Sequence, residues 1–132
     1  LVTINKNAAI VIDSDRRKEK GRLNSTKSRI KLEFERIGSM VWVTKGREIE
    51  NYVHPEVIAS LFAVSANAVP QKLQSVMEWV LADPKRKRIS PDKITLASKV
   101  VDRTMDVSGL SVLDLEGQVR ELVARIEKWN NM

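Results

Sequence analysis

Two short apolar runs near the start of the chain predict the strands of a parallel sheet. Residues 8–12 form an unbroken apolar run that ends at Asp13, and residues 40–44, apolar except for Thr44, form a second candidate for a buried strand. Apolar runs of this length without alternation favour strands that are buried on both faces. Between the runs, apolar residues with helical 4,3 spacing lead to a glycine at the position of a helix C-cap. These residues are Ile30, Phe34, Ile37 and Gly38. The order strand, helix, strand predicts a βαβ unit with a right-handed crossover.

The pattern after residue 52 predicts helices. His54 before Pro55 is typical of a helix start, because proline suits the first helical position, and that helix is expected to continue over residues 57–62. Another helix is predicted over residues 69–81, with Asp83-Pro84 ending it, because the residue before proline resists helical geometry.

Two amphipathic helices are predicted to complete the chain. Ser90-Pro91-Asp92 opens the first of them, and one face of it carries Ile94, Ala97, Val101 and Met105. The last helix has a 4,3,4,3 apolar stripe that is expected to cover a sheet face or meet a partner. The stripe consists of Leu115, Val119, Leu122, Ile126 and Trp129.

The length of 132 residues fits one domain of class α/β, with a parallel sheet, flanking helices and a helical carboxyl-terminal cover. We expect the α/β portion over residues 1–64 and the helical portion over residues 65–132. The chain has no cysteine, which excludes disulfides and thiolate metal sites and fits a cytoplasmic location. No apolar run approaches the ~20 residues that span a bilayer, so no membrane association is expected.

Positive charge gathers in two runs, within a chain whose formal net charge is +6. The first run has a single acid, Glu19, among eight basic residues: Arg16, Arg17, Lys18, Lys20, Arg22, Lys27, Arg29 and Lys31. The second, Lys85-Arg86-Lys87-Arg88, is expected between two helices. Either run alone is as well explained by solvated loop charge. Two runs beside a carboxylate site favour a phosphate-backbone partner.

Acidic residues follow both predicted strands, where open α/β sheets bind their ligands. Asp13 and Asp15 come at the end of the first run, and Glu48 and Glu50 come shortly after the second. Each pair has i, i+2 spacing, which in extended geometry puts both carboxylates on one face. Carboxylate oxygens suit Mg²⁺ or Mn²⁺, and two such ions ~3.5–4 Å apart cleave phosphodiesters. The alternative is a capping motif at the first pair and a solvated loop with an ion pair of Arg47 at the second.

Lys93 is a further candidate, because it stands in the first turn of a predicted helix, where the helix dipole disfavours a cation and an anion would remove the conflict. An exposed lysine explains the same pattern. Other chemistries have less support. The single histidine, His54, is in a predicted cap, and no Gly-rich phosphate loop is present.

These motifs resemble the TOPRIM nuclease domain of the OLD family (overcoming lysogenization defect). The members of this family are ATPase-linked endonucleases. The similarity spans nearly the whole chain and is carried by Asp13-Ser14-Asp15-Arg16 after a strand, by Arg47-Glu48-Ile49-Glu50-Asn51-Tyr52, by Asp92-Lys93-Ile94-Thr95-Leu96-Ala97 and by Ile126-Glu127-Lys128-Trp129-Asn130. The pairing of the first two motifs is far more specific than the first alone.

The resemblance implies a metal-dependent DNA endonuclease with a partial TOPRIM-like fold. Its metal ligands would be Asp13, Asp15, Glu48 and Glu50, with Asp13 and Glu48 catalytic and Lys93 near the scissile phosphate. Phosphate contacts are expected from Arg16, Arg17, Lys18, Lys20, Arg47, Lys85, Arg86, Lys87 and Arg88. The family also implies an ABC-type ATPase domain earlier in a longer chain, a role in phage defence, and assembly into dimers or larger homo-oligomers.

One departure from the family pattern concerns a glutamate that TOPRIM domains carry upstream of the two aspartates. Residues 1–12 contain no Asp or Glu, and the chain begins with Leu1. We therefore expect a piece of a longer protein that holds part of the site and is inactive or weak alone.

Two other functions fit the same residues. In a non-catalytic nucleic-acid-binding or interaction module, the basic runs would bind phosphates and the acids would be structural. A metal-dependent phosphatase or signalling domain would need a nucleophilic aspartate and a compact phosphate pocket, and the basic runs suit a long polyanion better.

Overall fold

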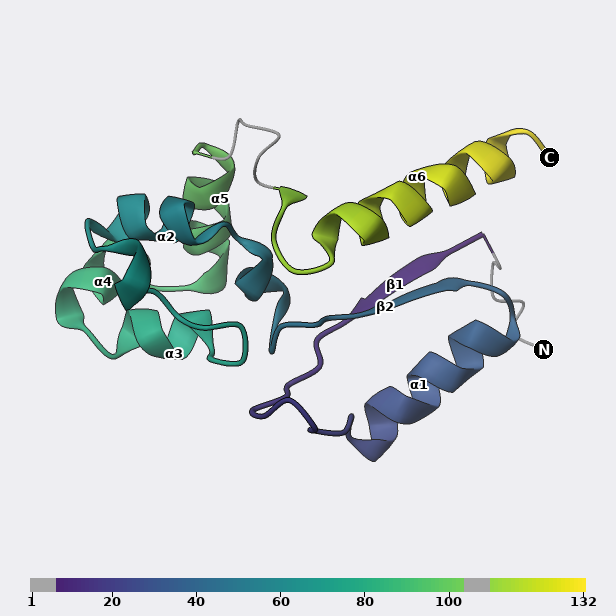
Figure 1. The fold of residues 1–132 in the computed structure, drawn as a ribbon, viewed down its shortest axis with the longest axis horizontal. Coiled ribbons are helices and arrows are strands. Elements are labelled where there is room, and N and C mark those ends of the chain that lie inside the picture. Colours follow the sequence, from purple (N-terminus) through teal and green to yellow (C-terminus); the bar gives the residue numbers. More distant parts are fainter. Residues whose placement is uncertain (1–6, 104–109) are drawn as a thin grey trace.

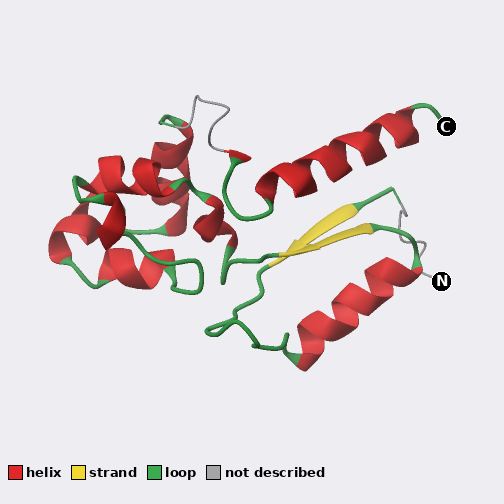
Figure 2. Cartoon of the chain, in the orientation of Figure 1, coloured by secondary structure: helices red, strands yellow, loops and turns green. Residues whose placement is uncertain are grey.

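The computed structural model describes residues 7–103 and 110–132. Figure 1 shows a sheet with a helix along each side, and a group of short helices beyond one end of the strands. Figure 2 shows the same view by element type. The elements are β1 (Ala9–Ile12), α1 (Ser25–Arg36), β2 (Met40–Val43), η1 (Ile49–Tyr52), α2 (Pro55–Phe62), η2 (Ala66–Ala68), α3 (Val76–Leu81), α4 (Pro84–Ile89), α5 (Lys93–Val101) and α6 (Leu115–Asn130).

The predicted strand–helix–strand unit is present. β1 and β2 pair in parallel, in a register that sets Ala9 opposite Met40 and Ile12 opposite Val43. The connecting helix α1 begins after Asn24, whose side chain accepts a hydrogen bond from the Lys27 amide at 2.9 Å. Gly38 has a φ of 79°, so it supplies the left-handed turn that returns the chain to β2. The class is therefore α/β, with a small parallel sheet.

Burial of the strands is less complete than the sequence predicts. In β1, Ile12 is buried but Ala9 and Val11 are exposed, whereas Met40 and Trp42 of β2 are buried. The expectation that residues 8–12 are buried on both faces is wrong for the residues described. Its physical reason is that the flanking helices pack mainly on β2: α1 contacts β2, and α6 packs on the cluster of Met40 and Trp42.

Apolar packing forms two clusters. One holds Met40, Trp42 and Tyr52, with Leu115 and Leu122 of α6 packed against them. The other joins the short helices through Ile58, Ala59, Leu61, Phe62, Val69, Val76, Met77, Val80 and Leu96. Thus α2 packs with the later helices, and α6 packs against the sheet.

The helix predicted over residues 69–81 is shorter than expected. It begins at Val76, where the Ser75 hydroxyl accepts a hydrogen bond from the Glu78 amide at 3.2 Å. The carbonyls of Gln71, Lys72 and Gln74 instead accept hydrogen bonds from Asn51 and Arg47, so this segment forms a turn against the site.

The second basic run lies within a helix, which corrects the expectation of a connection between helices. Asp83 caps the start of α4 by accepting a hydrogen bond from the Lys85 amide at 2.7 Å, and Pro84 takes the first helical position. Asp83-Pro84 therefore opens one helix as well as ending another. The run occupies most of α4, which places its side chains around a helix.

The face that α5 turns inward was predicted wrongly. Leu96 is 1% exposed and Ile94 is 84% exposed, and Ala97 and Val101 are exposed too. Met105 lies outside the described residues. The buried pair is Leu96 and the half-buried Val100, which are four residues apart and pack on the core of the short helices. Both faces of this helix are partly apolar, so spacing alone did not distinguish them.

The last helix covers one side of the sheet, as the sequence predicts (Figure 1). Of its stripe, Ile126 is exposed and the other members are half-buried. Arg125 also donates a hydrogen bond from Nη1 to the Gly38 carbonyl at 3.1 Å, across the end of the sheet. No helix in the described part of the chain is long and apolar enough to cross a membrane.

A pair of truncations tests the orientation of α5. We expect Leu96→Ala to lower the free energy of unfolding by about 2–5 kcal/mol, because it leaves a cavity in the core. Ile94→Ala, at an exposed position of the same helix, should change it by less than about 0.5 kcal/mol. Urea unfolding measures both, and a larger loss for Ile94→Ala would contradict the observed orientation.

Candidate functional site

Buried hydroxyl groups tie together the segments that follow the two strands. The Thr44 hydroxyl accepts a hydrogen bond from the Ser14 amide at 2.9 Å. Both hydroxyls donate to the Gly46 carbonyl, at 2.7 Å from Ser14 and 2.9 Å from Thr44. The Asp15 amide continues this pairing with the Arg47 carbonyl at 2.9 Å. The two acidic segments are thereby held side by side at the carboxyl ends of the strands.

Asp13 and Asp15 do not share a face. Asp15 has a φ of 52°, so the chain leaves extended geometry there and the premise of the i, i+2 argument fails. Asp13 accepts a hydrogen bond from the Ile49 amide at 2.8 Å, which turns its carboxylate toward the second acidic segment. Asp15 instead forms an ion pair with Lys27, which also donates to the Asp13 carbonyl at 2.7 Å.

Glu48 and Glu50 come together around Lys93. The ammonium of Lys93 lies 2.7 Å from Glu50 Oε1 and 4.0 Å from Glu48 Oε2. The side chains of Glu48 and Glu50 are 12% and 14% exposed. The hydrogen bond to Glu50 raises the pKa of Lys93 above its usual value, and the charges of Glu50, Glu48 and Asp13 act in the same direction against partial burial. Lys93 is therefore a cation that three carboxylates stabilise.

Two carboxylate oxygens at this point are buried without a hydrogen-bond donor, Glu48 Oε2 and Glu50 Oε2. A buried acceptor without a donor is costly, and it is common where a ligand or ion completes the set. Among residues 7–103 and 110–132, however, no three His, Cys, Asp or Glu side chains are placed so that they could hold a metal ion together. The predicted acids are thus gathered in one region without converging on one point.

Tyr52 supports the site through hydrogen bonds of its hydroxyl group, a role that the sequence did not reveal. Its hydroxyl accepts hydrogen bonds from the Lys45 amide at 2.8 Å and from Trp42 Nε1 at 3.3 Å. It donates to Asp114 Oδ1 at 2.6 Å, just before α6 begins. Burial and the bond to Asp114 raise the pKa of Tyr52. One hydroxyl therefore connects the end of the sheet to the covering helix.

Gly46 is required by close packing. A Cβ atom at this position would lie 2.6 Å from the Cβ of Asn51, which is too near the backbone to move aside easily. Asn51 in turn accepts a hydrogen bond from the Glu48 amide at 2.8 Å and donates to the Gln74 carbonyl at 2.9 Å. The side chain of Asn51 therefore sets the position of Glu48.

The predicted phosphate-binding residues divide into bonded and exposed groups. Arg47 forms a two-pronged ion pair with Glu78, at 2.9 and 3.1 Å. The Glu78 hydrogen bond raises the pKa of Arg47. The guanidinium of Arg86 lies 4.0 Å from the centre of the Trp79 ring and donates to the Trp79 carbonyl at 3.0 Å. Arg16 is half-buried. The exposed members are Arg17, Lys18, Lys20, Lys85, Lys87 and Arg88.

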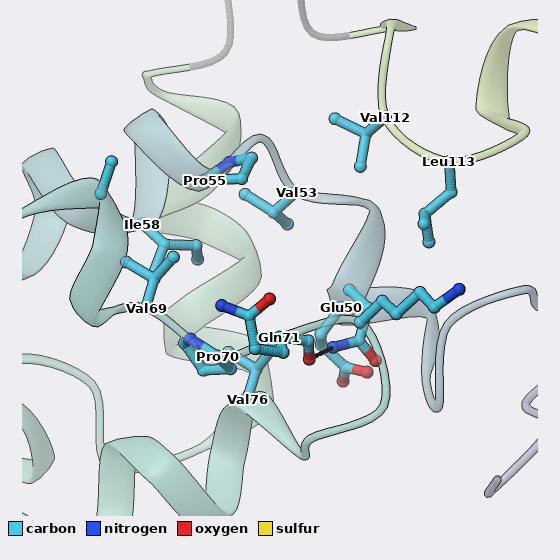
Figure 3. Close-up of a pocket in the computed structure, with 13 residues that line it drawn as sticks. Glu50, Val53, Pro55, Ile58, Val69, Pro70, Gln71, Val76, Val112 and Leu113 are labelled. Atoms are coloured by element: carbon cyan, nitrogen blue, oxygen red, sulfur yellow. Dashed lines mark hydrogen bonds between the residues drawn. The ribbon is translucent and has the colours of Figure 1, made fainter. Parts of the chain in front are cut away.

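An apolar pocket of about 170 Å³ lies next to the site (Figure 3). Glu50 lies at one end of it, and Val53, Ile58 and Val69 line the other. The pocket therefore brings apolar side chains close to one side of Glu50.

No protein-family model, curated protein or solved structure matches the chain.

A pair of glycine substitutions tests the packing at the site. We expect Gly46→Ala to lower the free energy of unfolding by about 1–3 kcal/mol, because the new methyl group overlaps Asn51. Gly117→Ala, in α6 where nothing lies within 4 Å of the new Cβ, should leave stability unchanged or raise it by up to about 1 kcal/mol. Thermal unfolding compares the two variants. A Gly46→Ala variant as stable as the wild type would contradict the close packing of Gly46 against Asn51.

Proposed function

We propose that the chain is part of a metal-dependent DNA endonuclease with a partial TOPRIM-like fold, as its resemblance to the OLD family suggests. The observation that carries the proposal is the meeting of Asp13, Glu48, Glu50 and Lys93 at the carboxyl ends of two parallel strands. Lys93 comes from α5, and its contact with Glu50 joins a helix of the second cluster to the sheet's edge. This is the edge at which open α/β sheets place their ligands.

The donor set suits a hard divalent cation. Glu48 and Glu50 each present an oxygen that has no donor, and Asp13 retains one oxygen beyond the one bonded to Ile49. Mg²⁺ or Mn²⁺ held there, two ions in the complete site, would lower the pKa of bound water and stabilise the leaving oxygen. Asp15 would join after release from Lys27. The residues' own contribution is to orient the phosphate, with Lys93 compensating the charge that develops on it.

Double-stranded DNA fits the charge around the site. The first basic run starts directly after Asp15, and Arg17, Lys18 and Lys20 are exposed there. A surface hollow of about 360 Å³ lies beyond it, lined by residues that include Arg17, Arg47 and Trp79. Trp79 also contacts Arg86, so one residue of the second run lies next to this hollow. A strand of phosphates crossing the hollow would meet positive charge from both runs.

The features that we propose for the whole protein follow from the resemblance to the OLD family. They comprise an ABC-type ATPase domain elsewhere in the protein, homo-oligomers, a cytoplasmic role in phage defence, and an upstream acid that completes the site. On this account the present chain binds metal and DNA and cleaves slowly at most.

A non-catalytic nucleic-acid-binding module is the second candidate, and one observation favours it. Each predicted metal ligand already has a partner within the chain. Asp13 accepts from the Ile49 amide, and Asp15 pairs with Lys27. Glu50 and Glu48 both pair with Lys93, at 2.7 and 4.0 Å. In that function the carboxylates fasten the loops together and the basic runs alone bind the partner.

Metal titration separates the two candidates. We expect saturable Mn²⁺ binding by calorimetry, lost in Asp13→Asn/Glu48→Gln, because isosteric amides remove the charge and keep the shape. Asp13→Asn also preserves an oxygen acceptor for the Ile49 amide. The matched control, Glu116→Gln/Glu121→Gln in α6, removes the same charge elsewhere and should bind like the wild type. Equal binding by the site variant and the wild type, or none by either, would favour the non-catalytic module.

Salt dependence tests the DNA path. We expect Arg17→Gln/Lys18→Gln/Lys20→Gln to weaken binding to duplex DNA and to reduce the slope of log affinity against log salt by about 2–3, since each lost phosphate contact removes about 0.9. The control triple variant in α6 is Arg120→Gln/Arg125→Gln/Lys128→Gln. Fluorescence anisotropy across a salt series measures both, and an equal loss in the two variants would indicate a response to net charge alone.

A further inference from the structure

The ammonium of Lys93 forms ion pairs with both Glu48 and Glu50. It contacts Glu50 Oε1 at 2.7 Å and lies 4.0 Å from Glu48 Oε2, which has no hydrogen-bond donor. Both glutamates are largely buried, so their mutual repulsion is weakly screened. A positive charge between them therefore offsets this repulsion.

We propose that Lys93 is an internal stand-in for the metal: its ammonium closes the site in the metal-free protein, and a divalent cation binds by displacing it from Glu50 and Glu48. The inference rests on the proposed function and goes beyond it, because it makes Lys93 a competitor of the cofactor as well as a group that serves the phosphate.

Three properties of Lys93 suit such an exchange. Its side chain is 54% exposed, so a released ammonium moves into water without crossing the core. Its backbone is fixed as the first residue of α5, where Asp92 caps the helix by accepting from the Thr95 amide at 2.8 Å. The helix dipole there disfavours a cation, which weakens the hold of the site on the lysine. Displacement therefore swings one flexible side chain and leaves the helix in place.

On this proposal, occupation of the two glutamates by Lys93 and by a metal ion is mutually exclusive. A lysine and a metal ion cannot share the same two carboxylates, because two cations at short range repel each other. With Lys93 present the glutamates are spaced for an ammonium. A released Lys93 would stand beside the metal with its charge free for a phosphate.

The opposite role, a purely structural strap, gives the opposite result. If Lys93 only holds α5 against the loop of Glu48 and Glu50, its removal loosens the carboxylates and metal affinity falls or stays the same. Competition predicts that removing the lysine strengthens metal binding while it removes a group needed for cleavage.

The test is calorimetric Mn²⁺ titration of the 132-residue chain and three variants. Lys93→Met removes the charge and keeps the stem, and we expect it to bind Mn²⁺ about threefold to fivefold more tightly, the range of an ion pair that no longer competes. Lys93→Arg keeps a cation and should stay close to the wild type. Lys45→Met removes one exposed charge three residues before Glu48, and it corrects for the general loss of positive charge.

The outcomes separate this inference from the proposed function. Tighter binding by Lys93→Met than by Lys45→Met supports the exchange. If the wild type binds Mn²⁺ and Lys93→Met binds it equally or more weakly, the exchange is wrong and the proposed metal site still stands. Absence of binding in the wild type and in Lys93→Met overturns both. Circular dichroism confirms that each variant is folded before titration.

Discussion

The hydrogen bonds between Ser14, Thr44 and the Gly46 carbonyl are the interaction on which the site depends. Two parallel strands alone form a weak sheet, and nothing in their ladder fixes the loops that follow them. The two buried hydroxyls bridge those loops, and the contact of Asp13 with the Ile49 amide follows from that bridge. Because the donors and acceptors are buried, breaking one leaves another without a partner, so the loops are held as a unit.

Electrostatics then determines how the acids are arranged. The loops bring Asp13, Glu48 and Glu50 to one edge, where their repulsion opposes folding unless a cation is present. Lys93 supplies that cation from α5 and so couples the helical cluster to the sheet. Tyr52 makes the corresponding link to α6 through Asp114. The covering helix and the short helices are both anchored at the proposed functional edge.

Local patterns predicted the elements better than the contacts between them. The strand–helix–strand unit and the start at His54-Pro55 follow from short-range spacing and cap chemistry, and both are present. The inward face of α5 was missed because Ile94 and Leu96 both fit a helical stripe, and only the shape of the neighbouring core selects Leu96. The positive φ of Asp15 was missed because the tendency of aspartate toward turns does not determine which residue of the Asp13-Ser14-Asp15 segment adopts it. The alternation of Ile12 and Ser14 with Asp13 and Asp15 could have predicted that the Ser14 side chain is buried.

The location of bound Mn²⁺ tests the central claim most directly. In NMR spectra of the isotope-labelled chain, a paramagnetic ion broadens the amide signals nearest to it. The account predicts broadening at substoichiometric Mn²⁺ for residues 13–14, 48–50 and 93, with α6 beyond Gly117 and the exposed end of α4 unaffected. Broadening centred on other acids, such as Glu116 and Glu121, or uniform weak broadening without saturation, would contradict the claim that this edge is a metal site.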